Sequence, residues 1–195
     1  MLNEKIEEKF LEKNTLLLTG EINEKTAEEI IEKILFLQFT FEEKCVPEID
    51  RKIVVLINSQ GGSIQAGFAI LDVLKATKAR IITVACGMAY SMGAFLLAMG
   101  SKGCRYALEN SEILLHQPLG GVQGQASDML IRTQNIIEKK EKLNKMLALA
   151  IGQDYKKIYY DLERDFILTP KQALDYGVVD KIIDNFQEVF GDDDV

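Results

Sequence analysis

Apolar positions follow two patterns along most of the chain. Short runs of mainly apolar residues, such as residues 53–57 and 80–86, are typical of strands that are buried on both faces of a parallel sheet. Between these runs, apolar residues recur every three or four positions, which is typical of helices that pack one face on a core. Because strand and helix patterns alternate, the sequence predicts an α/β fold with right-handed crossovers between parallel strands.

The boundaries of the expected elements come from the apolar runs and from capping residues. Asn23 is placed to cap a helix, and Thr169, Pro170 and Gln172 form a capping-box pattern with Gly177 at the far end. The expected strands are residues 15–19, 53–57, 80–86, 105–108, 113–116 and 178–183. The expected helices are residues 4–13, 23–35, 66–74, 91–99, 125–150, 154–162 and 169–177, whereas residues 42–52 are expected to form a loop.

Both central strands run into segments that contain glycine. Residues 58–63 follow the first strand and residues 87–94 follow the second, so both segments should lie at one edge of the sheet, where ligands of α/β proteins bind. The pair Gly61-Gly62 lets backbone N–H groups approach a ligand closely, and the start of the next helix adds partial positive charge. The phosphate-loop and dinucleotide patterns are both absent. Anion or oxyanion binding and a purely structural turn therefore remain open at this point.

Three residues carry the candidate chemistry. Ser91 lies between small residues at an expected strand-to-helix turn, which is typical of an exposed nucleophilic hydroxyl and also of a helix cap. A serine nucleophile needs a general base, and His116 is the only histidine, which also excludes a histidine-based metal cluster. By itself, His116 is also typical of a histidine at a strand end whose ring nitrogens are satisfied by hydrogen bonds. Asp165 precedes the capped helix in a connecting segment from which its carboxylate could reach the sheet edge, or it is simply a surface charge.

Composition narrows the class of protein. A chain of 195 residues with 47% hydrophobic and 27% charged residues is expected to form one domain, residues 1–195. The net charge of −7 argues against a nucleic-acid surface and against binding to a membrane surface. No run of about 18 apolar residues and no secretory signal is present, so we expect a cytoplasmic protein. The three cysteines have no metal-like spacing and are interpreted as reduced and structural.

Two further segments stand out by length and charge. Residues 125–150 would form a helix about 38 Å long, nearly the diameter of a domain of this size, so part of it should project. Its apolar stripe indicates a subunit interface, and its charged middle is also compatible with a solvated face. Residues 4–13 form a short charged helix that acts as a lid or contact element, and the acidic tail 191–195 is expected to be disordered.

These motifs, taken together and in order, resemble the family of the proteolytic subunit of the Clp protease, the ClpP family of serine peptidases. Several motifs agree with the family in order and register, and together they cover about residues 14–183. They are residues 57–63 (INSQGGS), 87–97 (GMAYSMGAFLL), 116–121 (HQPLGG), 163–165 (ERD) and 176–180 (YGVVD).

The resemblance implies a role for each matching residue. Ser91 matches the nucleophile, His116 the general base and acid, and Asp165 the carboxylate that orients the imidazole. The backbone N–H groups of Gly62 and Met92 match the oxyanion hole, so the resemblance favours oxyanion binding over phosphate binding. It also implies a ClpP/crotonase-like fold of repeated β-β-α units with a long protruding handle helix at residues 124–150.

The family also implies an assembly and partners. Its members form heptameric rings that stack into a hollow tetradecamer, and Arg164 matches a position of contact between rings. Unfolded polypeptides are delivered by an ATP-dependent AAA+ unfoldase of the Clp family. This chain is therefore expected to use no cofactor or metal of its own, since the unfoldase uses the ATP.

Three departures from the family pattern define the alternatives. Residues 1–13 form a shorter amino-terminal segment than family members carry, Gln60 stands where proline is common, and Tyr90 stands where alanine is common. The short segment motivates an alternative in which the chain is a low-activity or scaffold subunit that works only in a mixed ring with an active homologue. An acyl-CoA enzyme of the crotonase type shares the oxyanion turns but does not explain the three candidate catalytic residues.

Overall fold

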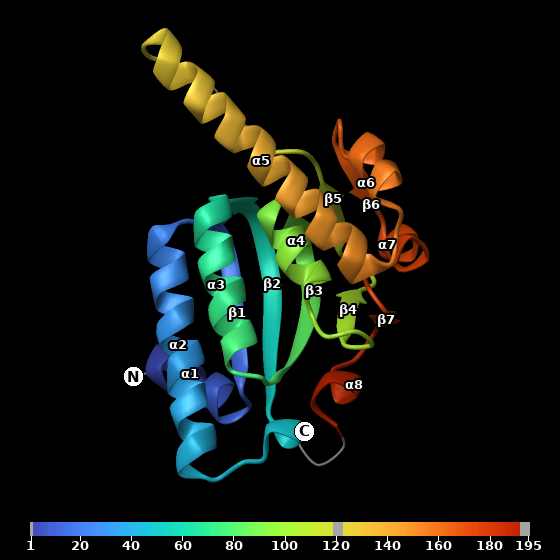
Figure 1. Cartoon of the computed structure of the whole chain (residues 1–195). Coiled ribbons are helices and arrows are strands. Elements are labelled where there is room, and N and C mark those ends of the chain that lie inside the picture. The colour runs from blue at the N-terminus through green and yellow to red at the C-terminus, as the bar shows by residue number, and fades with distance from the viewer. Residues whose placement is uncertain (1, 119–122, 192–195) are drawn as a thin grey trace.

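The computed structural model describes residues 2–118 and 123–191, in which strands and helices alternate as the apolar pattern predicts (Figure 1). The strands are β1 (Thr15–Ile22), β2 (Lys52–Gly62), β3 (Arg80–Tyr90), β4 (Arg105–Leu108), β5 (Glu112–Leu115), β6 (Phe166–Leu168) and β7 (Lys181–Ile183). The helices are α1 (Leu2–Glu12), α2 (Glu24–Glu43), α3 (Ile64–Ala76), α4 (Met92–Ala98), α5 (Ala126–Ile151), α6 (Tyr155–Asp161), α7 (Pro170–Tyr176) and α8 (Gln187–Phe190), with a 3₁₀ turn η1 (Glu48–Asp50). The predicted α/β fold class is confirmed.

The sheet is mainly parallel and has a short antiparallel extension. Its main order is β1-β2-β3-β4-β7, and every neighbouring pair in that series is parallel. The last residues of β3 leave β4 and pair instead with β5, which in turn pairs antiparallel with β6. This change of partner brings the ends of β3, β5 and β6 together at one corner of the sheet.

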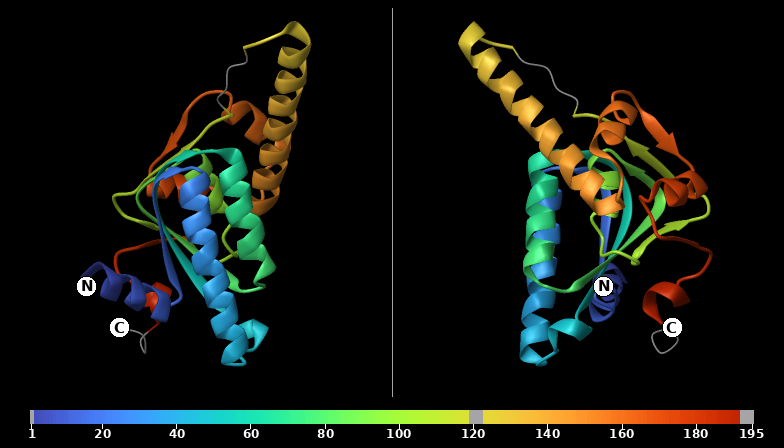
Figure 2. Two further views of the ribbon diagram at one scale, coloured as in Figure 1. Left: turned by 90° about the vertical axis from the view of Figure 1, so that its left-hand side faces the viewer. Right: turned by 45° about the vertical axis from the view of Figure 1, so that its right-hand side comes forward.

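The central strands are buried on both faces, as their uninterrupted apolar runs predict. In β2, Ile53, Val55 and Ile57 face a large core that α2, α3, α4 and α5 cover, whereas Val54 and Leu56 face a smaller core on the other side. The smaller core is closed by α8 and by Phe10 of α1. Figure 2 shows α1 and α8 next to each other, on the face of the sheet opposite α2 and α3. The amino-terminal segment is therefore a contact element of this second face.

Capping residues set the starts of the helices where the sequence predicted them. The side chain of Asn23 accepts a hydrogen bond from the N–H of Thr26 at the start of α2. Thr169 and Gln172 form the complete capping box of α7, and Gly177 ends that helix in the left-handed conformation. These local predictions are confirmed because a cap needs only partners within one helical turn.

Several predicted boundaries are wrong, mostly because the elements continue further. Helix α2 extends to Glu43, and only the segment between it and β2, with its 3₁₀ turn, remains of the predicted loop at 42–52. Strand β1 passes through Gly20, where the register with β2 shifts in a bulge. Strand β2 likewise includes residues 58–62 of the predicted turn at 58–63, and β3 includes residues 87–90 of the segment 87–94. Their glycines allow pairing to continue through irregular backbone. Strand β6 and helix α8 were not predicted.

Helix α5 projects from the body of the protein (Figure 1). Its buried residues, Asn144, Leu147, Ala148 and Ile151, lie in its last two turns, whereas Leu130 and Ile131 are largely exposed in the outer part. The helix spans 126–151, two residues later at its start than the predicted 124–150. No helix in the described ranges is long and apolar enough to cross a membrane. The tail predicted to be disordered is residues 191–195, of which 192–195 lie outside the described ranges, as do Gly120 and Gly121.

A buried ion pair joins β4 to the segment before β7. Asp180 accepts hydrogen bonds from the N–H groups of Gly103 and Arg105 and from the guanidinium of Arg105, at 2.6–3.0 Å. The same guanidinium donates to the carbonyl of Ala150 near the end of α5, at 3.3 Å. Partial burial raises the pKa of Asp180, but the hydrogen bonds and charge of Arg105 and the two N–H groups outweigh it, and the net pKa is lowered.

We expect Asp180→Ala to lower the free energy of unfolding by about 3–5 kcal/mol, because it leaves the guanidinium of Arg105 buried without its partner. The matched control is Asp175→Ala, which removes an exposed ion pair with Lys171 and should cost less than about 1 kcal/mol. Since the folded pKa of Asp180 lies below 3.8, the stabilisation is present above that pH and is lost as the pH falls through the folded pKa. Urea unfolding of both variants at pH 7 and pH 3 measures these changes in the free energy of unfolding. Equal losses of stability in the two variants at pH 7 would contradict the expectation.

Candidate active site

Ser91 sits at the tip between β3 and α4 in a strained backbone conformation. Its φ of 52° and ψ of −117° are rarely adopted by a residue other than glycine. The backbone is held there because the N–H of Ser91 donates to the carbonyl of Leu114 at 2.7 Å, while its own carbonyl accepts from Phe95 at 3.0 Å. Ser91 occupies the cap position of α4, but its side chain makes no capping hydrogen bond. The hydroxyl is therefore available to another partner.

Strand pairing brings His116 and Asp165 together from distant parts of the sequence. Strands β5 and β6 are antiparallel, and Leu115 of β5 pairs with Phe166 of β6. His116 follows the first of these residues and Asp165 precedes the second, so the two side chains extend from the same end of the pair. Tyr90 pairs with Leu114 in the parallel ladder of β3 and β5, which places Ser91 beside the same end.

The three side chains form a continuous hydrogen-bonded series. The Nε2 atom of His116 lies 2.8 Å from the hydroxyl oxygen of Ser91, and its Nδ1 atom lies 3.2 Å from a carboxylate oxygen of Asp165. In the tautomer that donates from Nδ1 to Asp165, Nε2 accepts the hydroxyl proton of Ser91. The side chain of His116 is 13% exposed, whereas that of Asp165 is 66% exposed. The series thus runs from the cleft outward to the surface.

Two glycines at the end of β2 are tightly packed, Gly61 against this tip and Gly62 against the end of β1. A Cβ atom on Gly61 would lie 2.6 Å from the carbonyl oxygen of Tyr90 and 2.7 Å from the Cβ of Ser91, and one on Gly62 would lie 2.2 Å from the carbonyl oxygen of Ile22. Gly62, Ser91, His116 and Asp165 share the lining of a cleft of about 390 Å³. Met92 is the first residue of α4, so its N–H has no partner within that helix. Gly62 thus lines the same cleft as Ser91, and Met92 directly follows Ser91 at the start of α4.

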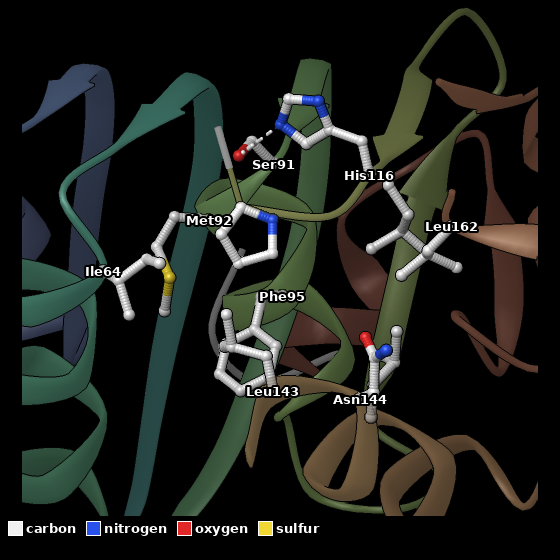
Figure 3. A pocket seen from close by; sticks show the side chains of 11 residues that line it. Ile64, Ser91, Met92, Phe95, His116, Leu143, Asn144 and Leu162 are labelled. Carbon is white, nitrogen blue, oxygen red and sulfur yellow. Dashed lines mark hydrogen bonds between the residues drawn. The ribbon is translucent and has the colours of Figure 1, made fainter. Parts of the chain in front are cut away.

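A second, narrower cavity of about 40 Å³ opens between Ser91 and the buried end of α5 (Figure 3). Its walls are mostly apolar, and besides Ser91 and His116 its polar lining includes Asn144, a residue of α5 that is 2% exposed. The Nδ2 atom of Asn144 is buried without a hydrogen-bond partner. The remaining lining residues are Ile64, Met92, Phe95, Leu115, His116, Pro118, Leu143, Leu147 and Leu162. The cavity therefore suits an apolar side chain that ends in a hydrogen-bond acceptor.

Tyr90 and Gln60, the two departures near the site, both line the cleft beside Ser91. The phenol of Tyr90 donates a hydrogen bond to the carboxylate of Glu112 at the start of β5. That hydrogen bond raises the pKa of Tyr90, with smaller contributions from burial and from the negative charge of Glu112. The side chain of Tyr90 is thus anchored to the neighbouring strand and forms part of the cleft rim.

Arg164 is exposed next to Asp165 and lines a shallow depression with His116, Gln117 and Glu163. Sequence reasoning identified Arg164 but missed the contributions of Gln117, Asn144 and Glu163. A polar residue at a core-facing position of the apolar stripe on α5 was a usable signal for Asn144. In the described ranges, the acidic, cysteine and histidine side chains form no group of three or more that could hold a metal ion.

A comparison with models of protein families agrees with this geometry. Residues 2–186 match the model of the Clp protease family, so the match covers nearly the whole chain and includes every residue of the site.

Proposed function

The chain belongs to the Clp protease family, and we propose that it is a serine endopeptidase subunit that hydrolyses peptide bonds of unfolded proteins and short peptides. The observation that carries this proposal is the distance of 2.8 Å between the hydroxyl of Ser91 and Nε2 of His116, whose Nδ1 is next to Asp165. A serine hydroxyl is too weakly acidic to attack an amide unaided, and a neighbouring imidazole supplies the base that it needs.

In the proposed mechanism, the oxygen of Ser91 attacks the carbonyl carbon of the scissile peptide bond while Nε2 of His116 takes the hydroxyl proton. The imidazolium then donates that proton to the leaving amine as the C–N bond breaks, which leaves an acyl-enzyme on Ser91. A water molecule, deprotonated by the same nitrogen, hydrolyses the ester and restores the hydroxyl. Asp165 orients the imidazole and stabilises its positive charge in both steps.

The negative charge that develops on the carbonyl oxygen requires hydrogen-bond donors. We assign this role to the backbone N–H groups of Gly62 and Met92, which come from the end of β2 and the start of α4. The first N–H groups of a helix have no partner within it, which supports this role for Met92. Each donor would lower the barrier by about 3–4 kcal/mol. This proposal uses the glycine pair for oxyanion binding, as the family resemblance favours.

We further propose that the site lies inside an oligomeric chamber, formed by heptameric rings that stack into a tetradecamer. The projecting outer part of α5, with its exposed Leu130 and Ile131, and the exposed Arg164 support contacts between copies. Substrates would be unfolded chains delivered in the cytoplasm by an AAA+ unfoldase of the Clp family, which would use the ATP. A scaffold subunit that works only in a mixed ring with an active homologue remains the second candidate.

The proposal is tested with purified protein that has been separated by size into monomer and ring fractions. Ring fractions should cleave fluorogenic peptides and should react with a fluorophosphonate at Ser91, as mapped by mass spectrometry. A ring that shows neither cleavage nor labelling would rule out the active peptidase. Activity that appears only after an active homologue is added would favour the scaffold subunit.

We expect Asn144 to set the preference for the residue whose carbonyl is attacked. A buried unpaired N–H costs about 1–3 kcal/mol, and a substrate side chain that ends in an acceptor removes this cost. Asn144→Leu should therefore lower, by about tenfold, the ratio of kcat/KM for a peptide with glutamine at this position to kcat/KM for one with norleucine. Asn135→Leu, an exposed position on the same helix, is the control. An unchanged ratio in Asn144→Leu would contradict this expectation.

A further inference from the structure

Lys140 of α5 is the one residue of that helix whose ammonium group bonds to both segments that carry His116 and Asp165, within the ranges that the structure describes. It donates to the side-chain oxygen of Gln117 at 3.0 Å and to the carboxylate of Glu163, and it lies 4.3 Å from the ring centre of Tyr159. Its side chain is 15% exposed. By contrast, Lys145 on the same helix forms a solvent-exposed pair with Glu141. Lys140 is therefore a partly buried residue that connects α5 to the segments that carry His116 and Asp165.

The two partners of Lys140 are also bonded to each other's segments. Gln117 directly follows His116, and its side-chain amide donates to the carbonyl of Glu163 at 2.9 Å. The backbone N–H of Gln117 donates to the carbonyl of Leu162 at 2.8 Å. Glu163 lies two residues before Asp165. Lys140 therefore completes a closed set of hydrogen bonds that holds the segment after β5 against the segment before β6.

This set of bonds acts where strand pairing ends. The last pair of β5 and β6 is Leu115 with Phe166, so His116 and Asp165 lie just outside the ladder. The contact between them spans 3.2 Å, and water competes for the exposed carboxylate of Asp165. An exposed carboxylate keeps one orientation only if the backbone is held both before and after it in the chain. The ladder of β5 and β6 holds the backbone after Asp165, and the hydrogen bonds of Lys140, Gln117 and Glu163 hold the backbone before it.

We propose that Lys140 is a positioning residue that keeps Asp165 in register with His116 and so couples the placement of α5 to the reactivity of Ser91. This inference rests on the proposed peptidase function. Lys140 does not line the cleft or the apolar cavity beside Ser91, so it acts through Asp165 and not on the substrate. A displacement of the projecting helix α5 would therefore change this contact.

The test is a double-mutant cycle measured by peptide cleavage in ring fractions of matched size. Lys140→Met keeps the length of the side chain but removes the charge, and should lower kcat by tenfold or more with little change in KM. In the Asp165→Asn background, the same substitution should change kcat less than twofold, because the group through which Lys140 acts is already lost. Lys140→Arg should retain at least a third of the wild-type kcat, and Lys145→Met should match the wild type.

A pH profile separates positioning from a simple change of charge. The titratable and charged groups around His116 are Asp165, Glu163, Arg164 and Lys140, with Tyr90 and Glu112 on the neighbouring strands. Removing a nearby cation alone would favour the protonated imidazole, whereas loss of the contact with the carboxylate of Asp165 would disfavour it. We therefore expect the acid limb of the kcat/KM profile of Lys140→Met to shift to lower pH.

The inference is overturned if Lys140→Met matches the wild type, if its effect is equally large in the Asp165→Asn background, or if the acid limb shifts to higher pH. Should Lys140→Met fail to assemble, Gln117→Leu removes the same set of bonds from the other side and is expected to show the same cycle and the same shift. Failure of the proposed function is distinguishable, since a wild-type ring would then neither cleave peptides nor react at Ser91.

Discussion

Replacing Ser91 by alanine is expected to lower kcat for peptide cleavage by about 10⁶-fold, because it removes the atom that forms the acyl-enzyme. The substitution deletes only a hydroxyl, and the backbone of residue 91 remains held by its hydrogen bonds to Leu114 and Phe95. The variant should therefore assemble normally and still bind peptide. Steady-state cleavage of a fluorogenic peptide, together with sedimentation and circular dichroism, measures both parts of this expectation.

The matched control for this variant is Ser127→Ala, which removes an exposed hydroxyl at the start of α5. It should leave kcat within about twofold of the wild-type value, since surface substitutions of this kind change little. Residual cleavage by Ser91→Ala at more than about a hundredth of the wild-type rate would show that another group is the nucleophile. The same result would remove the basis for the roles given to His116 and Asp165.

Replacing Gly61 by alanine is expected to lower kcat/KM by at least a hundredfold and the free energy of unfolding by about 3–4 kcal/mol. The φ of +89° at this position costs an alanine about 1–2 kcal/mol, and the added methyl group would overlap the Tyr90 carbonyl and the Cβ of Ser91. The overlap must be relieved by moving β2 away from the tip that carries Ser91. A displacement of about 1 Å at a reacting group is enough for a hundredfold loss.

Gly152→Ala is the matched control for Gly61→Ala, because Gly152 has a φ of +73° and a Cβ there would meet no atom within 4 Å. It should cost only the backbone strain of about 1–2 kcal/mol and should leave kcat/KM nearly unchanged. Urea unfolding and peptide cleavage on both variants separate conformational strain from steric overlap. Equal effects of the two substitutions would show that Gly61 is needed only for its backbone conformation.

Several candidate site residues could be found in the sequence because they have a local signature, whereas Asp165 was assigned its role only through the family resemblance. Ser91 lies among small residues, His116 is the single histidine, and the Gly61-Gly62 pair follows a buried strand. These signatures left alternatives that the residues themselves could not resolve. Whether Ser91 caps α4 or serves as a nucleophile depends on where its hydroxyl points. That direction follows from the backbone conformation of Ser91, which a hydrogen bond to Leu114 of another strand helps to hold.

The supporting residues were not accessible in the same way. Asn144 and Lys140 belong to a helix whose periodicity predicts which face is apolar, but not what that face meets. The missed strand β6 has only three residues and becomes a strand by pairing with β5. The extended ends of β2 and β3 were read as turns because glycine is typical of turns, although here it allows close packing of one strand end on another.

The sequence by itself determined the alternation of strands and helices, the strands buried on both faces, the helix caps and the candidates Ser91 and His116. Each of these depends on residue type and on spacing over a few positions, where sterics and hydrogen bonding within one turn or one strand decide the outcome. The tertiary structure decided the partners: the shift of β3 from β4 to β5, the pairing of Leu115 with Phe166, and the contact of Lys140 with both segments of the site. These contacts join residues far apart in the chain, and only the packing of the whole sheet fixes which of them form.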